Sequence, residues 1–392
     1  MIKLLTFSTL YPSSIQPNHG IFVETRLRHL LESGQVESHV IAPVPWFPFK
    51  GTVFSGYGKF ARTPREEILN GIRVLHPRYP LIPKIGMSIA PLFLAFSMIP
   101  VIRHMIREGY DFDVIDSHYF YPDGVAAVML GKYFNKPVTV TARGTDINLI
   151  PNYRIPRKMI LWAAKRASGL ITVCQALKDA MVNLGIDSDH IISLRNGVDL
   201  DIFHPIDRVK CRQELNLKYF TLLSVGSLIK RKAHELIIET LTSLSDVELL
   251  IAGSGPEYNN LVSLVRRFNV ENRVRFLGTI PQAELPKYYG SADALVLASS
   301  REGWANVLLE SMACGTPVVA SNVWGTPEVV NTHDAGLLMP ERTASGIARA
   351  VTELRNNYPD RNATRFYAEQ FNWDATTQGQ LDLFRRILSQ KS

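Results

Sequence analysis

The stretch from Arg301 to Ser321 reads REGWANVLLESMACGTPVVAS and decides the fold. Two glutamates, Glu302 and Glu310, bracket an apolar segment that passes through a Cys-Gly-Thr-Pro turn into a β-branched run. An ionised carboxylate loses its hydration on burial, so two of them around a core-like segment need partners. The pattern predicts a loop, a short helix and a buried strand, with both carboxylates accepting hydrogen bonds from ligand hydroxyls.

Short apolar runs alternate with helical patterns on both sides of this stretch, as in βαβ units with a parallel sheet. There are eleven such runs, more than one sheet holds, so the sequence predicts an α/β protein with two doubly wound, Rossmann-like domains. The runs cover residues 2–9, 38–43, 112–118, 137–144, 169–173, 190–197, 220–226, 247–253, 273–278, 294–299 and 317–321.

Strand signals stop and turn residues cluster between residues 196 and 215, where Pro205 bars a continuing helix. We therefore expect one Rossmann-like domain over residues 1–205 and a second over 206–372. Residues 373–392 are expected to form a helix that packs back on the first domain.

The composition indicates a soluble globular protein, with 46% hydrophobic and 20% charged residues among 392. The three cysteines form no CxxC pair, which favours a reducing cytosol over disulfides or a zinc site. The net charge of +7 comes from scattered basic residues without a nucleic-acid-binding motif. It suits a phosphate-bearing substrate or an acidic membrane surface, and no nucleic-acid partner is expected.

Two segments of the first half raise the question of a membrane. Residues 79–102 are strongly apolar but contain three internal prolines, so we expect a helix docked on the domain surface or a membrane-contacting face, and no full span. Residues 42–64 are aromatic and basic, and form either a self-packed loop or a membrane-docking one.

Ligands of parallel sheets bind outside the carboxyl ends of the strands, so a binding site is expected in the loops there. The loop after residues 294–299 carries Glu302 and leads into a helix for which Asn306 is the expected N-cap. This would leave the N–H groups of Val307 and Leu308 free to meet an anion. If the loops of two such sheets faced each other, they would enclose a cleft.

These residues resemble the second domain of the retaining GT-B glycosyltransferases called family 4. The hallmark is two glutamates separated by seven residues before a Gly-Thr-Pro-Val-Val strand, and EGWANVLLESMACGTPVV matches it closely. The resemblance extends over nearly the whole chain through LRNGVDLDIFHP, IAGSGPE, VRFLGTIP and GTPEVV. It implies the GT-B fold, two Rossmann-like domains facing across a cleft, with helices at the C-terminus.

The resemblance also implies roles at the donor site. Glu302 would contact the transferred sugar and Glu310 the ribose of a nucleotide-sugar. The backbone of Asn306, Val307 and Leu308 would meet the diphosphate.

The family usually presents an arginine and a lysine to that diphosphate, in a pattern like Gly-Arg-x-x-x-x-Lys-Gly. Here Lys232 matches the lysine, whereas Ser227 stands in place of the arginine and Ala233 in place of the second glycine. Arg231 is the candidate for the missing charge, and Gly303 lies in the donor loop.

In the first domain, Gly20 matches a glycine that lets the backbone approach the donor. His118 matches a histidine near the reacting sugar carbon; without the resemblance, a lone histidine after a strand is more often structural. Arg143, Gly144 and Asp146 occupy an acceptor-side turn where the family often has a polar cluster.

The implied reaction moves a hexose-type sugar from a UDP- or GDP-sugar to a glycan or lipid-linked glycan, with retention of configuration. Glu302, His118 and Lys232 form the expected catalytic set. No metal and no cofactor are expected, although 111–113 and 199–201 have the Asp-x-Asp form, because such triplets are common. The expected setting is bacterial surface polysaccharide synthesis, in the cytoplasm or peripheral on the inner face of the plasma membrane.

Four alternatives stay open. A hydrolase would use the two glutamates as an acid/base pair but would leave Lys232 without a task. A dehydrogenase is disfavoured because residues 253–256, GSGP, lack the third glycine of the dinucleotide fingerprint. A GT-B sugar-nucleotide epimerase would need no acceptor. A catalytically silent glycan-binding scaffold has Ser227 as its only hint.

Overall fold

The computed structural model describes residues 1–47, 55–81 and 86–390. It divides into two compact units, residues 1–195 with 374–392 and residues 196–373. The division falls at 195/196 rather than the expected 205/206, because the intervening segment is bonded to the end of the second unit. Val198 N donates to the Phe371 carbonyl at 2.8 Å, and an Arg365 guanidinium nitrogen donates to the Phe203 carbonyl at 2.6 Å.

The first unit is built on an eight-stranded sheet with the order β10-β9-β8-β7-β1-β2-β5-β4. Every neighbouring pair is parallel except β4 and β5. The central strands are buried along their whole length, as expected where helices cover both faces. The strands are β1 Ile2–Phe7, β2 Val36–Ile41, β4 Glu66–Leu69, β5 Ile72–Leu75, β7 Val114–His118, β8 Val138–Ala142, β9 Gly169–Thr172 and β10 Ile191–Ser193, with β3 Val44–Pro45 and β6 Arg78–Tyr79 forming a separate parallel pair.

The β4–β5 hairpin is an addition that the sequence analysis missed. Its two-residue turn, Asn70-Gly71, has positive φ at both positions (49° and 78°). Asn-Gly is the standard signal for such a turn, so the information was present in the sequence.

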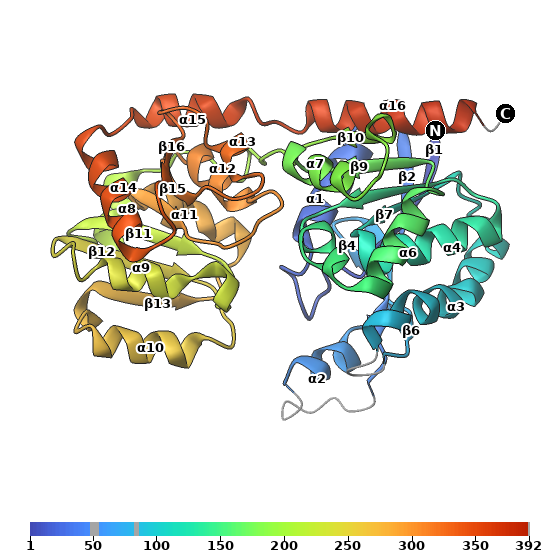
Figure 1. Cartoon of the computed structure of the whole chain (residues 1–392), viewed down its shortest axis with the longest axis horizontal. Coiled ribbons are helices and arrows are strands. Elements are labelled where there is room, and N and C mark those ends of the chain that lie inside the picture. The colour runs from blue at the N-terminus through green and yellow to red at the C-terminus, as the bar shows by residue number, and fades with distance from the viewer. Residues whose placement is uncertain (48–54, 82–85, 391–392) are drawn as a thin grey trace. The chain divides into compact units, whose positions relative to one another are not determined.

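The first unit's helices include one from the far end of the chain (Figure 1). Helix α16 packs Leu381 and Phe384 against Leu4 of β1 and Val114 of β7, and so completes the first unit's core. The helices are α1 Ile21–Glu32, α2 Ser55–Arg62, α3 Gly86–Arg107, α4 Val125–Phe134, α5 Thr145–Asn148, α6 Arg154–Ala164, α7 Gln175–Asn183 and α16 Asp374–Ser389.

The second unit has a six-stranded, wholly parallel sheet with the order β13-β12-β11-β14-β15-β16. Its strands are β11 Phe220–Val225, β12 Val247–Ala252, β13 Val274–Gly278, β14 Ala294–Leu297, β15 Val318–Ser321 and β16 Gly336–Met339, the last of which was not expected. Its helices are α8 Arg208–Glu214, α9 His234–Thr240, α10 Tyr258–Arg267, α11 Leu285–Ser291, α12 Asn306–Ala313, α13 Thr326–Val329, α14 Ala344–Asn356 and α15 Arg361–Glu369. The two doubly wound sheets confirm the predicted fold class.

Each sheet has one place where the strand order reverses, between β1 and β7 in the first unit and between β11 and β14 in the second. The crossovers after these strands lie on opposite faces, so the loops at their carboxyl ends part and leave room for a ligand. The loops after β11 and β14 carry residues 226–232 and 298–305, which include Lys232 and Glu302.

The apolar segment expected at residues 79–102 is helical from Gly86, as α3; residues 82–85 lie outside the described part. By length and composition, Ser88–Arg107 could cross a membrane, and 39% of its most apolar window is buried. Length and composition alone are a weak indication, because core helices satisfy the same criteria. Within the aromatic segment 42–64, residues 55–62 form α2, and residues 48–54 are not described.

Candidate active site

Two cationic side chains lie beside one carboxylate at the second unit's switch point, the place where the strand order reverses between β11 and β14. The Lys232 ammonium lies 2.6 Å from Glu302 Oε1, and an Arg231 guanidinium nitrogen lies 3.2 Å from the same oxygen. Glu302 is 9% exposed. Burial would raise its pKa, but the charges of Lys232 and Arg231 and the hydrogen bond from Lys232 outweigh burial and lower it. Glu302 is therefore an ionised carboxylate held between two cations.

Local backbone features bring these side chains together. Ser300 N donates to the Arg231 carbonyl at 2.9 Å, and Arg231 donates to the Arg301 carbonyl at 2.7 Å, so the two loops are bonded to each other. Gly226 has φ 150°, and a Cβ there would lie 3.3 Å from Cε of Lys232. A side chain at position 226 would therefore crowd the lysine stem that reaches Glu302.

The structure shows the surroundings of Ser227 and Ala233, the two residues that depart from the family pattern. Ser227 is exposed, and its carbonyl accepts from the ring Nε2 of the buried His234 at 3.3 Å. Ala233 adopts a left-handed conformation with φ 52°, which explains why glycine suits this position. Arg231 and Lys232 contact the same carboxylate oxygen of Glu302, at 3.2 and 2.6 Å.

The expected cap of α12 was wrong. Ala305 is the N-cap residue and Asn306 is the first residue of the helix, where its side-chain oxygen accepts from the Asn196 amide at 3.2 Å. Leu308 N donates to the Ala305 carbonyl at 3.0 Å, so this group is not free. Among the residues that the structure describes, the N–H groups of Asn306 and Val307 have no protein acceptor. An anion at this helix end would meet those two groups.

Glu310 lies one turn inside α12, away from the cations. Its carboxylate accepts from the Tyr289 hydroxyl at 2.7 Å. Burial raises the pKa of Glu310 to about 7, although the hydrogen bond from Tyr289 opposes this. Glu302 and Glu310 thus have opposite pKa shifts, because only Glu302 has cations beside it. At neutral pH Glu302 is therefore ionised, whereas Glu310 is near the midpoint of its titration.

The first unit's switch point holds a buried histidine between opposite charges. His118 Nε2 lies 3.2 Å from an Asp116 carboxylate oxygen, and His118 Nδ1 lies 2.7 Å from an Arg143 guanidinium nitrogen. All three side chains are at least 92% buried. Burial lowers the pKa of His118 to about 4, with Arg143 and Arg26 adding to it and Asp116 opposing it. His118 is therefore neutral at physiological pH, with Nε2–H donating to Asp116 and Nδ1 accepting from Arg143.

The turn that contains Arg143, Gly144 and Asp146 is held by hydrogen bonds to the Asp146 carboxylate. The Asp146 carboxylate accepts from the backbone N–H groups of Phe120 at 2.7 Å, Gly144 at 2.7 Å and Arg143 at 3.1 Å. These bonds hold the loops after β7 and β8 to each other. In this structure Asp146 and Gly144 position the His118 loop, and their side of the turn is buried.

Gly20 serves the first loop in a similar way. It is the residue before α1, with φ 68°, and a Cβ there would lie 2.3 Å from the Leu10 carbonyl carbon. The glycine lets the loop after β1 pass closely over its own backbone, which fixes the path of residues 8–20.

Several buried partners of these groups were not predicted from the sequence. Asp116 stands two residues before His118, so both side chains lie on one face of β7, a signal the sequence did offer. Arg26 lies among the apolar, core-facing residues of α1 and donates to Gln380 of α16 at 2.7 Å. Asp123 accepts from Thr9 N at 2.7 Å, and burial raises its pKa to about 7. No sequence pattern brings α16 to Arg26.

The two Asp-x-Asp triplets have other partners. Asp111 pairs with Lys136 at 2.8 Å, and Asp113 accepts from Lys3 N at 2.8 Å. Asp199 accepts from the backbone N–H groups of residues 201 and 202. Across residues 1–47, 55–81 and 86–390, no group of three or more His, Cys, Asp or Glu side chains is arranged to hold a metal ion.

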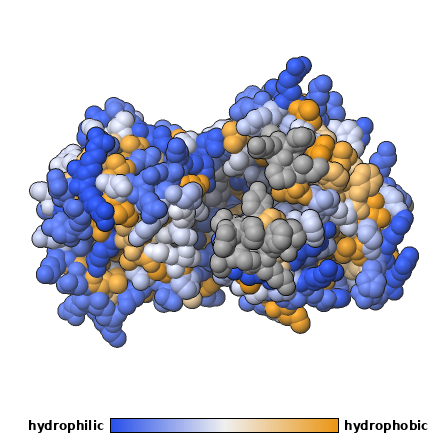
Figure 2. All heavy atoms as spheres, turned by 90° about the horizontal axis from the view of Figure 1, so that it is seen from below, coloured by the Kyte–Doolittle hydropathy of each residue, from blue (hydrophilic) through white to orange (hydrophobic). Residues whose placement is uncertain are grey.

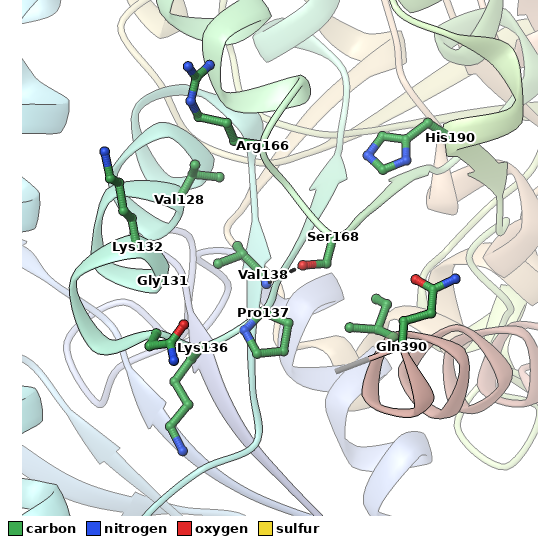
Figure 3. Close-up of a pocket in the computed structure, with 12 residues that line it drawn as sticks. Val128, Gly131, Lys132, Lys136, Pro137, Val138, Arg166, Ser168, His190 and Gln390 are labelled. Carbon is green, nitrogen blue, oxygen red and sulfur yellow. Dashed lines mark hydrogen bonds between the residues drawn. The ribbon is translucent and has the colours of Figure 1, made fainter. Parts of the chain in front are cut away.

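A cavity of about 640 Å³ lies at the amino ends of the first sheet's strands, next to Val138 at the start of β8 (Figure 3). It is lined by cationic side chains, but Figure 3 shows Lys136 pointing away from Lys132 and Arg166, so the charges do not converge. Because it is at the amino ends of the strands, it lies away from the switch-point loops.

Comparison with known proteins identifies the family. The family described as glycosyl transferases group 1 matches residues 206–371, and glycosyltransferase family 4 matches residues 22–202. The chain is a GT-B glycosyltransferase of the family 4 type. It is 28% identical over 367 residues to the putative teichuronic acid biosynthesis glycosyltransferase TuaC of Bacillus subtilis, covering 91% of this chain and 90% of TuaC.

More distant relatives and solved structures agree with this glycosyltransferase fold. A D-inositol 3-phosphate glycosyltransferase of Mycobacteroides abscessus is 28% identical over 304 residues, covering 72% of this chain and 68% of that protein. The sucrose-phosphate synthase of Thermosynechococcus elongatus has a TM-score of 0.80 at 19% identity, with 99% of each chain covered. Anabaena HepE, solved with UDP, has a TM-score of 0.74 at 17% identity, covering 98% of this chain and 100% of HepE.

Proposed function

We propose that this glycosyltransferase moves a hexose-type sugar from a UDP- or GDP-sugar to a glycan or lipid-linked glycan acceptor, with retention of anomeric configuration. The observation that carries the proposal is the convergence of Lys232 and Arg231 on Glu302 beside the N-terminus of α12. A diphosphate needs cations and N–H donors together, and a sugar needs a hydroxyl acceptor next to them. This site offers both.

Donor binding would exchange partners within this cluster. The diphosphate draws Lys232 and Arg231 and meets the N–H groups of Asn306 and Val307. Glu302, released from part of its ion pairing, accepts a hydroxyl of the transferred sugar, and Glu310 accepts the ribose hydroxyls. The cations that hold the pKa of Glu302 low in the free protein thus become the groups that stabilise the leaving group.

The transfer step breaks the bond between the anomeric carbon and the diphosphate oxygen, which takes the electron pair. The acceptor oxygen bonds to the same face of the anomeric carbon, and its proton passes to a phosphate oxygen. Lys232 and the α12 N-terminus stabilise the charge that develops on the diphosphate. His118 is neutral and has both ring nitrogens engaged, so it does not serve as a nucleophile.

The relatives support the donor and pathway parts of the proposal. HepE was solved with UDP and with UDP-glucose, and starch synthase IV of Arabidopsis with ADP. TuaC is described as acting in teichuronic acid biosynthesis. We therefore favour a nucleotide-sugar donor and a role in bacterial surface polysaccharide assembly at the cytoplasmic side.

The test is nucleotide release from a panel of UDP-, GDP- and ADP-sugars, with thermal shift measured alongside. One donor should stabilise the protein and be slowly hydrolysed. Lys232→Met should lower that release roughly 100-fold or more, whereas Lys287→Met, which breaks a surface ion pair with Glu214, should leave it unchanged. An isomerised donor without acceptor would point to an epimerase, and no shift with any donor would point to the glycan-binding scaffold.

A lipid-linked acceptor would place the enzyme on a membrane, and α3 offers a surface for that contact. Ile89, Phe93, Phe96 and Pro100 follow one another at helical spacing along one face, and the same stripe continues with the basic residues 103 and 107. Phe96 is 64% exposed. Seen from below in Figure 2, apolar atoms gather on the part of the first unit where Figure 1 places α3.

The two arginines of that stripe, Arg103 and Arg107, favour contact with an anionic membrane surface. Arg103 stacks over the Tyr133 ring at 5.1 Å, and within the described ranges neither Arg103 nor Arg107 pairs with a carboxylate. Apolar side chains beside unpaired cations are the composition of an interfacial helix. Phe96→Asp should abolish sedimentation with phosphatidylglycerol vesicles at low salt, while Phe366→Asp, at another exposed phenylalanine, should not. A wild-type protein that stays in the supernatant would exclude membrane docking.

A further inference from the structure

Another cavity, of about 610 Å³, lies at the outer edge of the first sheet, between the β4–β5 hairpin and the C-terminal half of α3. It is lined by residues 65–66, by residues 73–78 and by residues 100–108 of α3. All of these belong to the first unit, and in the described part of the chain no lining residue comes from the loops after β1, β7 or β8. The cavity has the volume of a small-molecule site and shares no lining residue with either switch point.

One group of lining side chains carries charges that pair with one another. Arg73 Nε lies 2.6 Å from a Glu66 carboxylate oxygen, and another Arg73 guanidinium nitrogen lies 3.8 Å from a Glu108 oxygen. His104 Nε2 lies 3.3 Å from the other Glu108 oxygen. A carboxylate offers about four lone-pair sites, so Glu66 and Glu108 can each still accept a hydrogen bond from a hydroxyl group.

The second group consists of two arginines, Arg65 and Arg78. Arg78 donates to the carbonyls of Thr63 and His76, the latter at 2.8 Å, and these bonds fix the orientation of its guanidinium group. Burial and the charge of Arg65 lower the pKa of Arg78, so the two cations are close enough to repel each other. Over residues 1–47, 55–81 and 86–390, neither arginine pairs with a carboxylate.

An anion at Arg65 and Arg78 would remove this repulsion and accept from the N–H donors that remain. A guanidinium group presents its donors in a planar fork, which matches the oxygens of a phosphate. The first group offers no such place, because Arg73 is already paired with Glu66 and Glu108. The lining thus combines a site for an anion with acceptors for hydroxyl groups.

We propose that this cavity binds a phosphate ester whose alcohol part carries hydroxyl groups. The phosphate lies on Arg65 and Arg78, and the hydroxyls donate to Glu66 and Glu108. Inorganic phosphate would use only the arginines and a neutral polyol only the carboxylates, so a molecule with both groups fits the whole lining. This site goes beyond the proposed function, and binding there requires neither the Lys232–Glu302 cluster nor sugar transfer.

Two kinds of molecule carry this chemistry, a soluble phosphate ester and the headgroup of a glycerol-phosphate lipid. Pro100 lines the cavity and also belongs to the apolar stripe of α3, so the cavity adjoins the surface that we propose for membrane contact. The experiment therefore has one arm for each source.

The experiment titrates the full chain with glycerol 3-phosphate, inorganic phosphate and glycerol, and follows binding by ligand-observed NMR. Glycerol 3-phosphate should bind most tightly of the three. Arg65→Gln should weaken its binding about tenfold or more, the size of a lost hydrogen bond between charged groups. Arg65 is exposed, so this variant should fold, which thermal unfolding checks.

Two control variants show where the ligand binds. Arg157→Gln makes the same change at an exposed arginine of α6 that does not line the cavity, and it should leave binding unchanged. Lys232→Met removes a cation from the second unit and should also leave binding unchanged. Loss of glycerol 3-phosphate binding in Lys232→Met would assign the ligand to the Lys232–Glu302 cluster and overturn the proposal, without bearing on the proposed transfer.

The proposal is also overturned if glycerol 3-phosphate does not bind, if Arg65→Gln binds it as well as the wild type, or if inorganic phosphate binds equally tightly. For a lipid source, phosphatidylglycerol vesicles should displace glycerol 3-phosphate and phosphatidylcholine vesicles should not. Arg65→Gln should then also sediment with the phosphatidylglycerol vesicles less than Arg157→Gln does. If neither kind of vesicle displaces glycerol 3-phosphate, the site is supported with a soluble phosphate ester as its ligand.

Discussion

The raised pKa of Glu310 gives the donor site a pH dependence that can be measured directly. The Glu310 carboxyl accepts from the Tyr289 hydroxyl, and burial raises its pKa to about 7. Only the ionised carboxylate accepts both ribose hydroxyls, because the protonated form carries a donor of its own. Affinity for a nucleotide-sugar should therefore rise with pH through neutrality.

The magnitude follows from the titration. With a pKa of about 7, the ionised fraction is roughly one-eleventh at pH 6 and ten-elevenths at pH 8, so affinity should rise about tenfold, or about 1.4 kcal/mol. The stability of the fold depends on pH in the opposite direction. Because the pKa of Glu310 is raised in the folded protein, its contribution to the free energy of unfolding is complete below the unfolded pKa and is lost as the pH rises towards 7. Donor binding at pH 8 recovers hydrogen bonds for the buried charge.

The assay is isothermal titration with the intact nucleotide-sugar, whose diphosphate has no titratable proton between pH 6 and 8. Glu310→Gln should bind with an affinity that is flat across this range. Tyr289→Phe removes the hydrogen bond that favours ionisation, and should shift the rise to higher pH. A flat wild-type profile, or an unchanged slope in Glu310→Gln, would refute the reasoning.

Three further outcomes follow from the same contacts. Glu302→Gln should lower turnover roughly 100- to 1000-fold while nucleoside diphosphate still binds, because the two cations remain; near-normal turnover would remove Glu302 from the site. Gly20→Ala should destabilise the protein by roughly 3 kcal/mol, since its Cβ would meet the Leu10 backbone. Gly34→Ala, with a similar φ of 67° and no atom within 4 Å, should cost about 1 kcal/mol, as thermal unfolding of both would show. His118, with its pKa lowered to about 4, should add no inflection to the pH–rate profile between pH 6 and 7, which a wild-type profile compared with His118→Gln would reveal.

The alternation of strands and helices, and with it the two parallel sheets, could be predicted from the amino-acid sequence. Buried parallel strands must be apolar on both faces, and they are too short to be confused with helices of ten residues. The Glu302 loop was predictable because it joins a buried strand to a short helix, whereas Lys232 followed from the resemblance of residues 226–233 to the family pattern. The β4–β5 hairpin was within reach through its Asn70-Gly71 turn.

Only the tertiary structure decided which side chains share a charge environment. Glu302 and Glu310 are equivalent in sequence, yet two cations from a loop 70 residues away lower the pKa of one, and burial raises that of the other. His118 is neutral because burial and the charges of Arg143 and Arg26 lower its pKa to about 4, against the opposing effect of Asp116. Coulomb interactions depend on distance and on burial, and neither is written in local sequence.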